Sequence, residues 1–387
     1  MSRVFYCNEQ YEDYVLYGFN LASIENVSIK FIEKAEVTNS SVYLMPVWQF
    51  SDIDANVSSD VLTKISTLND AHVYTRQDFY LTDVNQIASN VLKLVRKYNI
   101  KPQNIWIRTG YEFQKQELDE ALQQMNITQV NTISFNTYLH HTYVRMHDVE
   151  YTEVDSNSAK RFSTFSRRYD DWRFEFFCGL IDKRLLDNFN YTFTNCAPEQ
   201  IPVYPHISKS KEELKASDIV AECHRKGDLY FWIDNLPYTV NHDNMTDPYP
   251  NELNDLYKSS HINIVLETLP VHSHQPGSSI MITEKTFKAI AMGKPFILYS
   301  PAGIIDLLKK LGFKTFDPFL DESYNNDSPT KADAILNEIK RLDSMSDTEF
   351  HLLTSKLQKT AKFNLNKFKR LGAENATKLN LLKNVLW

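Results

Sequence analysis

The chain has 387 residues, of which 42% are hydrophobic and 13% aromatic, and this length suggests two domains. Its 42 Lys and Arg residues against 49 Asp and Glu residues give a net charge of −7, which argues against a uniformly basic, nucleic-acid-binding surface. The sequence contains no apolar run long enough to span a bilayer and no hydrophobic N-terminal segment, so we expect a cytoplasmic protein. The four cysteines are scattered and indicate neither a disulfide framework nor a zinc site.

Glycine spacing excludes two common classes of nucleotide-binding protein. The nine glycines lie far apart, so the sequence holds neither GxGxxG nor GxxxxGK[ST]. Dinucleotide-binding Rossmann enzymes and P-loop NTPases need those glycines where the backbone approaches phosphate. The chain therefore fits neither class.

The first 150 residues alternate short apolar runs with amphipathic stretches. The predicted strands cover residues 42–47, 72–74, 104–108 and 130–135. The predicted helices cover residues 58–68, 84–98 and 110–125. This alternation predicts a parallel sheet with helices on its faces. Residues 138–157 show no clear period and are expected to form a crossover between domains.

The same alternation of predicted strands and helices begins again at residue 160. The predicted strands cover residues 160–165, 189–194, 262–266, 296–299 and 314–316. The predicted helices cover residues 171–186, with Asp171 as the cap, and 211–225, 283–292, 304–311, 331–342 and 347–386. Residues 197–250 are otherwise expected to be loops, including the aromatic run 229–233. The fold class is therefore α/β, with two Rossmann-like domains (1–150 and 151–387) and a long C-terminal helical tail.

Polar residues concentrate around one strand-loop-helix-strand unit of the second half. The strand 262–266 ends at Glu267, and the helix opens with Thr283, Glu284 and Lys285. Ligands of open α/β sheets lie outside the carboxyl ends of the strands, so we expect a binding site here.

Several motifs in this region carry a family resemblance. Residues 291–297 (AMGKPFI) resemble the helix-turn-strand signature of a GT-B donor domain. Residues 266–268 (LET) with 283–285 (TEK) resemble the donor motif of α-1,3-fucosyltransferases. Arg173, with an aromatic residue and a leucine at matching spacing, resembles the first donor-domain helix of that family. Residues 160–325 are similar to glycosyltransferase-like proteins of tailed phages and large viruses.

The resemblance implies a GT-B arrangement, in which the two domains face a cleft and residues 151–387 bind a nucleotide-diphosphate sugar. It implies no cofactor beyond that donor substrate and no metal, because cations and helix N-termini offset the charge of the leaving diphosphate. The expected donor-binding residues are Arg167, Arg168, Arg173, Glu267, Thr283, Glu284 and Lys285. Lys288 stands where many retaining GT-B enzymes have a Glu, so we expect an inverting transfer.

An inverting transfer needs a general base near the acceptor hydroxyl. Asp52, Asp78 and Glu112 each follow a predicted strand of the acceptor-side domain, and Glu112 is favoured because Gly110 gives its loop freedom. Asp52 with Asp54 also forms a D-x-D triplet, which could instead bind a metal or cap the next helix.

Three hypotheses for function remain open. The first is a metal-independent glycosyltransferase acting on a glycan, lipid-linked or small-molecule acceptor, located in the host cytoplasm if the protein is phage-encoded. The second is the same chemistry on hydroxymethylated bases of phage DNA. The third is a non-catalytic binding or structural protein that retains the fold.

Overall fold

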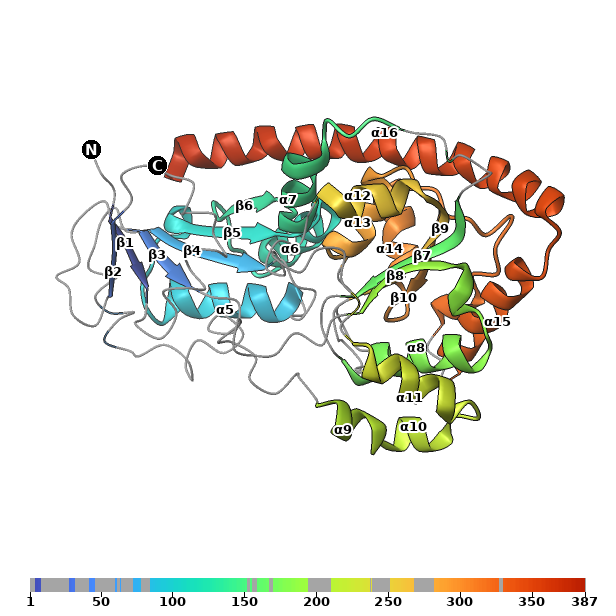
Figure 1. Ribbon diagram of the computed structural model, residues 1–387. Helices are drawn as coiled ribbons and strands as arrows, with labels where there is room; N and C mark the ends of the chain where they lie inside the picture. Colours follow the sequence, from blue (N-terminus) through green and yellow to red (C-terminus); the bar gives the residue numbers. More distant parts are fainter. Residues whose placement is uncertain are drawn as a thin grey trace. The chain divides into compact units, whose positions relative to one another are not determined.

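The computed structural model describes residues 4–7, 28–31, 42–45, 60, 63, 72–77, 84–151, 154, 159–166, 170–193, 210–236, 238, 251–267, 282–326 and 330–386. The chain divides into two compact units. The first is made mainly of Met1–His140 and Glu374–Trp387, and the second of His141–His274 and Ile280–Ala373. Each unit has its own parallel sheet, so the α/β fold class predicted from sequence is confirmed (Figure 1).

The first unit contains a six-stranded sheet in the order β2-β1-β3-β4-β5-β6, with every pair parallel. Its strands are β1 (Val4–Cys7), β2 (Ser28–Phe31), β3 (Val42–Met45), β4 (His72–Gln77), β5 (Ile105–Thr109) and β6 (Asn131–Ser134). The chain passes from β1 to β2 on one side and then from β3 outward on the other. The last four strands match predicted ones, whereas β1 and β2 were not predicted.

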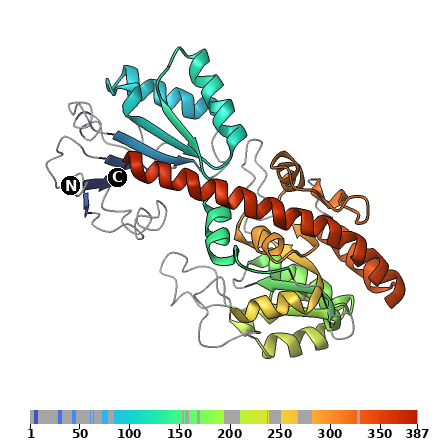
Figure 2. The ribbon, with the colours of Figure 1, turned by 90° about the horizontal axis from the view of Figure 1, so that it is seen from above.

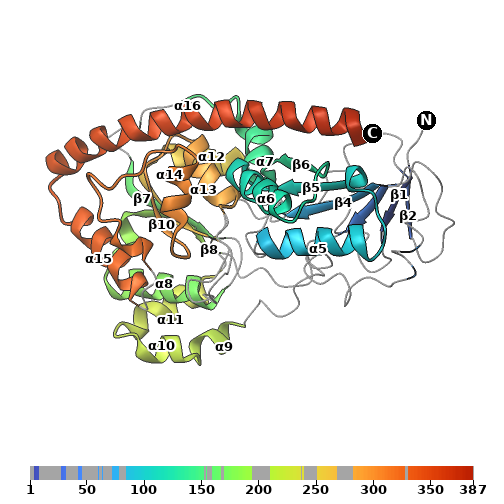
Figure 3. The same cartoon turned by 180° about the vertical axis from the view of Figure 1, so that it is seen from behind.

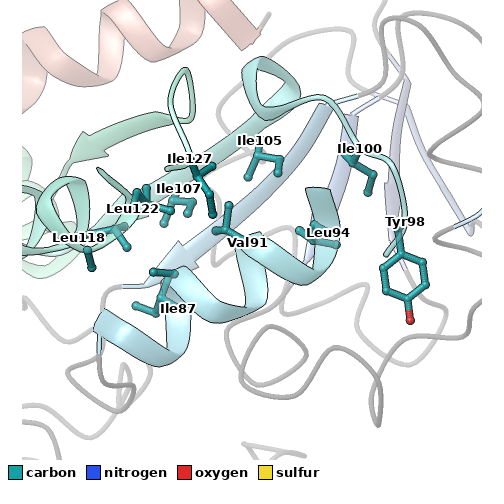
Figure 4. Packing of buried hydrophobic residues seen from close by; sticks show 12 residues of the cluster. Ile87, Val91, Leu94, Tyr98, Ile100, Ile105, Ile107, Leu118, Leu122 and Ile127 are labelled. Carbon is teal, nitrogen blue, oxygen red and sulfur yellow. The ribbon is translucent and has the colours of Figure 1, made fainter. Parts of the chain in front are cut away.

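The helices α5 (Val84–Arg96) and α6 (Glu112–Gln124) build one hydrophobic core against β5. Ile87, Val91 and Leu94 lie on one face of α5 because their spacing follows the helical period. They meet Ile105 and Ile107, which lie on the same side of β5 because strand side chains alternate (Figure 4). The 3-10 helix η3 (Pro102–Asn104) connects this layer to β5.

The predicted crossover, residues 138–157, begins with a helix that the sequence did not predict, α7 (Thr137–Met146), and the boundary between the two units falls within that helix, between His140 and His141. The side-chain oxygen of Asn136 accepts a hydrogen bond from the Leu139 N–H at 2.8 Å, which satisfies a donor in the first turn. The buried Arg108 side chain donates to Thr137 Oγ1 at 3.1 Å. These contacts compensate for a sequence rich in Thr, Tyr and His, whose helix propensities are low.

The second unit contains a four-stranded parallel sheet in the order β10-β9-β7-β8. Its strands are β7 (Lys160–Ser166), β8 (Phe189–Phe193), β9 (Ser260–Leu266) and β10 (Phe296–Tyr299). Every residue of β9 and β10 is buried, as expected for strands covered on both faces. Its other elements are α8 (Asp171–Asp182), η4 (Leu186–Asn188), α9 (Lys211–Lys215), α10 (Asp218–Glu222), α11 (Lys226–Asp234), α12 (Asn251–Lys258), α13 (Glu284–Ala291), α14 (Ile304–Lys310), η6 (Ser323–Asn325) and α15 (Lys331–Asp343).

Four predictions for this unit are corrected. The single helix expected over 211–225 is two short ones, because Ser217 caps α10 by accepting from the Val220 N–H. The aromatic run 229–233 lies inside α11, where Trp232 and Ile233 are buried. Residues 314–316 form no strand, and Asp171 is the first helical residue of α8, with Asp170 at the N-cap.

The helical tail predicted over 347–386 is confirmed as one continuous helix, α16 (Asp347–Leu386), which Figure 2 shows along its length. Its last part, from Glu374 onward, belongs to the first unit. There the Asn375 side chain donates to Asn136 O at 2.7 Å, and its Oδ1 accepts from the Asn136 N–H at 3.4 Å. These bonds fix this end of α16 beside the start of α7.

Candidate functional site

The order of strands in the second unit creates a topological switch point between β7 and β9. From β7 the chain passes through α8 to β8 on one side, and it later adds β9 and β10 on the other side. The connections that leave β7 and β9 at their carboxyl ends therefore diverge. In open α/β sheets this divergence forms the crevice where ligands bind.

The side chain of Glu267, directly after β9, is buried and serves the start of α13. Its Oε1 accepts from the Thr283 N–H at 3.1 Å, and its Oε2 accepts from Thr283 Oγ1 at 2.6 Å. Thr286 Oγ1 donates to the same carboxylate at 2.5 Å. Thr283 is the N-cap of α13 and its Oγ1 also accepts from the Lys285 N–H. A carboxylate at a helix N-terminus is favourable, so Glu267 anchors α13 to the end of β9.

Arg173, in the first turn of α8, reaches across the switch point to β9. Its Nη2 donates to the carbonyl oxygens of Glu267 at 2.7 Å and Leu266 at 3.5 Å. Its Nη1 forms an ion pair with Asp170 at 2.8 Å, and its guanidinium lies 4.8 Å from the ring centre of Trp172. The side chain is 3% exposed. Arg173 is thus buried and already engaged, so a contact with phosphate requires some of these bonds to be exchanged.

Glu284 and Lys285 open α13 and are partly exposed, at 21% and 23%, with an ion pair of 2.8 Å between them. Burial raises the pKa of Glu284, but the nearby ammonium groups of Lys285 and Lys288 outweigh it and lower that pKa to about 2. Glu284 is therefore ionised at neutral pH and can accept hydrogen bonds from hydroxyl groups. Lys285 supplies an accessible cation at the positive end of the helix dipole.

Two residues that the sequence did not mark as functional, Lys331 and Asn325, form hydrogen bonds just after the carboxyl end of β10. The Lys331 ammonium is 1% exposed and donates to Ser300 O at 2.9 Å. The Asn325 side-chain oxygen accepts from the N–H groups of Gly303 and Ile305, both at 3.1 Å, and so satisfies the start of α14. Lys331 was predicted only as the first residue of a helix, and no local pattern marks its contact with Ser300, 31 positions earlier.

Glu112, the favoured candidate base, lies at the start of α6 in the first unit. Its carboxylate accepts hydrogen bonds from Ser134 Oγ and, at 2.8 Å, from the Lys378 ammonium of α16. Burial raises the pKa of Glu112, but the bonds from Lys378 and Ser134 together lower it below its ordinary value. A carboxylate whose ionised form is stabilised in this way is a weaker base. In the structure, Glu112 binds Lys378 and so helps to hold α16.

The other predicted residues lie outside the described part of the chain. Arg167 and Arg168 follow β7 directly, and Asp52 and Asp78 follow β3 and β4. Within the described residues, no group of three or more His, Cys, Asp or Glu side chains is arranged to hold a metal ion. The described helices also include none that is both long and apolar enough to cross a membrane.

Of the predicted donor residues that the structure describes, all five lie where β7, β9, α8 and α13 meet. Glu267 and Thr283 contact each other, Arg173 contacts the Glu267 backbone, and Glu284 pairs with Lys285. They form two groups. Arg173, Glu267 and Thr283 are buried, and they connect the end of β9 to the starts of α8 and α13. Glu284 and Lys285 are partly exposed.

Comparison with known proteins gives little beyond this geometry. No protein-family model matches the sequence, and no curated protein matches it. Among solved structures, the chain is similar to a mutant of phage T4 BGT in complex with UDP-glucose, with a TM-score of 0.37 and 8% sequence identity over 99% of both chains.

Proposed function

We propose that this chain is a glycosyltransferase that moves a sugar from a nucleotide-diphosphate donor to an acceptor hydroxyl. The observation that supports it most is the switch point of the second unit, where an accessible Lys285 opens a helix beside the ends of β7 and β9. The dipole at a helix N-terminus favours negative charge, and the Lys285 ammonium adds a cation to it. We therefore propose that the donor binds where β7, β9 and the start of α13 meet.

The chemistry assigned to each residue follows from the charge of the reaction. The departing nucleoside diphosphate gains negative charge in the transition state, and Lys285 with the N-terminus of α13 offsets it. Ionised Glu284 accepts hydrogen bonds from ribose hydroxyls. Arg167 and Arg168, which follow β7, add guanidinium groups for the phosphate oxygens. With these cations the transfer is proposed to be metal-independent.

An inverting transfer also needs a base, and the first unit is proposed to supply it. The lowered pKa of Glu112 and its bond to Lys378 make it a poor choice. Asp52 and Asp78, which follow β3 and β4, are therefore preferred. If Asp52 and Asp54 instead bind a metal ion as a D-x-D triplet, the transfer should require that metal.

The test is ligand-induced stabilisation followed by donor hydrolysis. UDP-, GDP- and dTDP-sugars are screened by thermal shift, with a CMP-sugar as the monophosphate control, and the best donor is then assayed for hydrolysis with and without EDTA. A nucleotide-dependent rise in Tm and EDTA-resistant hydrolysis are expected. Activity lost in EDTA and restored by Mn²⁺ supports the D-x-D reading. Absence of both stabilisation and hydrolysis across the set means a non-catalytic protein that retains the fold.

The acceptor is a glycan, a lipid-linked sugar, a small molecule or a hydroxymethylated base in DNA. The net charge of −7 weighs against DNA, because phosphate contacts need a basic surface. A gel shift with duplex DNA at rising salt distinguishes these cases. Binding that weakens steeply with salt indicates DNA, and no shift leaves the other acceptors.

A further inference from the structure

Two cysteines of the second unit, distant in sequence, lie side by side. The thiols of Cys178 and Cys223 are hydrogen-bonded to each other. Cys178 lies on α8 and is 2% exposed, whereas Cys223 follows α10 and is only partly buried. Figure 3 shows that α8, α10 and α11 pack together.

The backbone around Cys223 is held firmly against α8. The Asp182 carboxylate, one helical turn beyond Cys178, accepts hydrogen bonds from the N–H groups of His224 and Arg225, both at 2.9 Å. The Cys223 thiol also donates to Ile219 O at 3.3 Å. The two bonds from Asp182 hold the chain just after Cys223 against α8, the helix that carries Cys178, so a disulfide between the two thiols would link segments that are already neighbours.

The two thiols differ in reactivity. The hydrogen bond from Cys178 lowers the pKa of the Cys223 thiol, even though burial raises it. The same bond, together with burial, raises the pKa of Cys178. The accessible sulfur is therefore the one that ionises more easily, as in cysteines that react with oxidants.

We propose that Cys178 and Cys223 form a dithiol that a peroxide converts reversibly into a disulfide. The Cys223 thiolate attacks one oxygen of hydrogen peroxide, the O–O bond breaks, and Cys223 becomes a sulfenic acid while hydroxide leaves. The Cys178 sulfur then attacks that of Cys223. The S–O bond breaks, the Cys178 proton departs with the oxygen as water, and the S–S bond forms. Two thiols are oxidised and one peroxide is reduced to water.

The disulfide joins the middle of α8 to the junction of α10 and α11. The first turn of the same helix carries Arg173, which contacts the end of β9. The crosslink therefore restrains an element that reaches the switch point. The inference rests on the cysteine pair alone and stands whether or not the chain transfers sugars.

The test is peptide mapping of the full chain after oxidation. Reduced protein is treated with a small excess of hydrogen peroxide, blocked with N-ethylmaleimide and digested without reductant. The expected product is a peptide linking Cys178 to Cys223, which dithiothreitol separates. The same result is expected in a background with Cys7→Ser and Cys196→Ser, which removes the chain's other thiols.

Single variants separate the two steps. In Cys178→Ala, Cys223 should stop at the sulfenic acid and be captured by dimedone. In Cys223→Ala, the buried Cys178 should remain unmodified. The proposal is overturned if wild-type Cys223 proceeds to sulfinic acid without a crosslink, or if either cysteine links instead to Cys7 or Cys196. The mapping of the wild-type chain decides this even if a variant fails to fold.

Discussion

The Arg173 guanidinium donates a 2.7 Å hydrogen bond to the backbone oxygen of Glu267, 94 positions along the chain. The Glu267 carboxylate in turn accepts bonds from Thr283, the N-cap of α13. One series of hydrogen bonds thus connects the start of α8, the end of β9 and the start of α13. These three elements meet at the switch point. A change at Arg173 should therefore alter the positions of the end of β9 and the start of α13 as well.

Replacing Arg173 by Ala should destabilise the second unit by about 2–3 kcal/mol. The change leaves two buried carbonyl oxygens without their charged donor and removes the packing on Trp172. Urea unfolding measures the loss. Lys183→Ala, at the other end of the same helix, is the control and should cost less than about 0.5 kcal/mol. Equal stability of wild type and Arg173→Ala would show that the observed bonds contribute little.

Replacing Lys285 by Ala should leave stability within about 1 kcal/mol, because the side chain is 23% exposed and lies at the positive end of a helix. Donor turnover should fall about a hundredfold or more, as when one preorganised charge-stabilising group is lost. The stabilisation by a bare nucleoside diphosphate should shrink as well. Lys309→Ala, which removes a lysine 49% exposed, is the control and should change none of these. A full diphosphate shift in Lys285→Ala would place the donor elsewhere.

Glu284 should make stability depend on pH in the acidic range. Its pKa is about 2 in the folded protein against an ordinary 4.5, so the folded state binds fewer protons between these values. Its contribution, about 1–3 kcal/mol, is present above pH 4.5 and disappears as the pH falls through 2. Urea unfolding of wild type and Glu284→Gln across this range should show a stability difference that narrows toward low pH. A constant difference would mean that this pKa is not lowered.

Glu112→Gln separates a general base from a structural contact. Donor turnover should stay within about threefold of wild type, whereas loss of an essential base costs about a hundredfold or more. Hydrogen exchange of the amides in 374–386 should accelerate, because the ion pair with Lys378 is weakened. Lys378→Met should accelerate the same amides. A hundredfold loss of turnover in Glu112→Gln alone would restore it as the base.

The sequence by itself determined the local elements and part of the candidate site. The apolar run at 262–266 predicted a strand of a parallel sheet, and β9 forms there and is completely buried. Thr283 before an amphipathic run predicted the start of α13. Gly293 marked the turn into β10, where φ is 61°, a backbone conformation that favours glycine. These features arise from interactions among residues a few positions apart, so a local pattern carries them.

Only the tertiary structure decided which elements are neighbours. The alternation of predicted strands and helices did not show that β7 lies between β8 and β9. This strand order creates the switch point. Nor did it show that Arg173 is bonded to β9 or that Cys178 meets Cys223. The helix α7 formed where no period was visible. Such contacts depend on the free energy of packing a whole sheet with its helices, because each partner is supplied by a distant segment that no short stretch of sequence specifies.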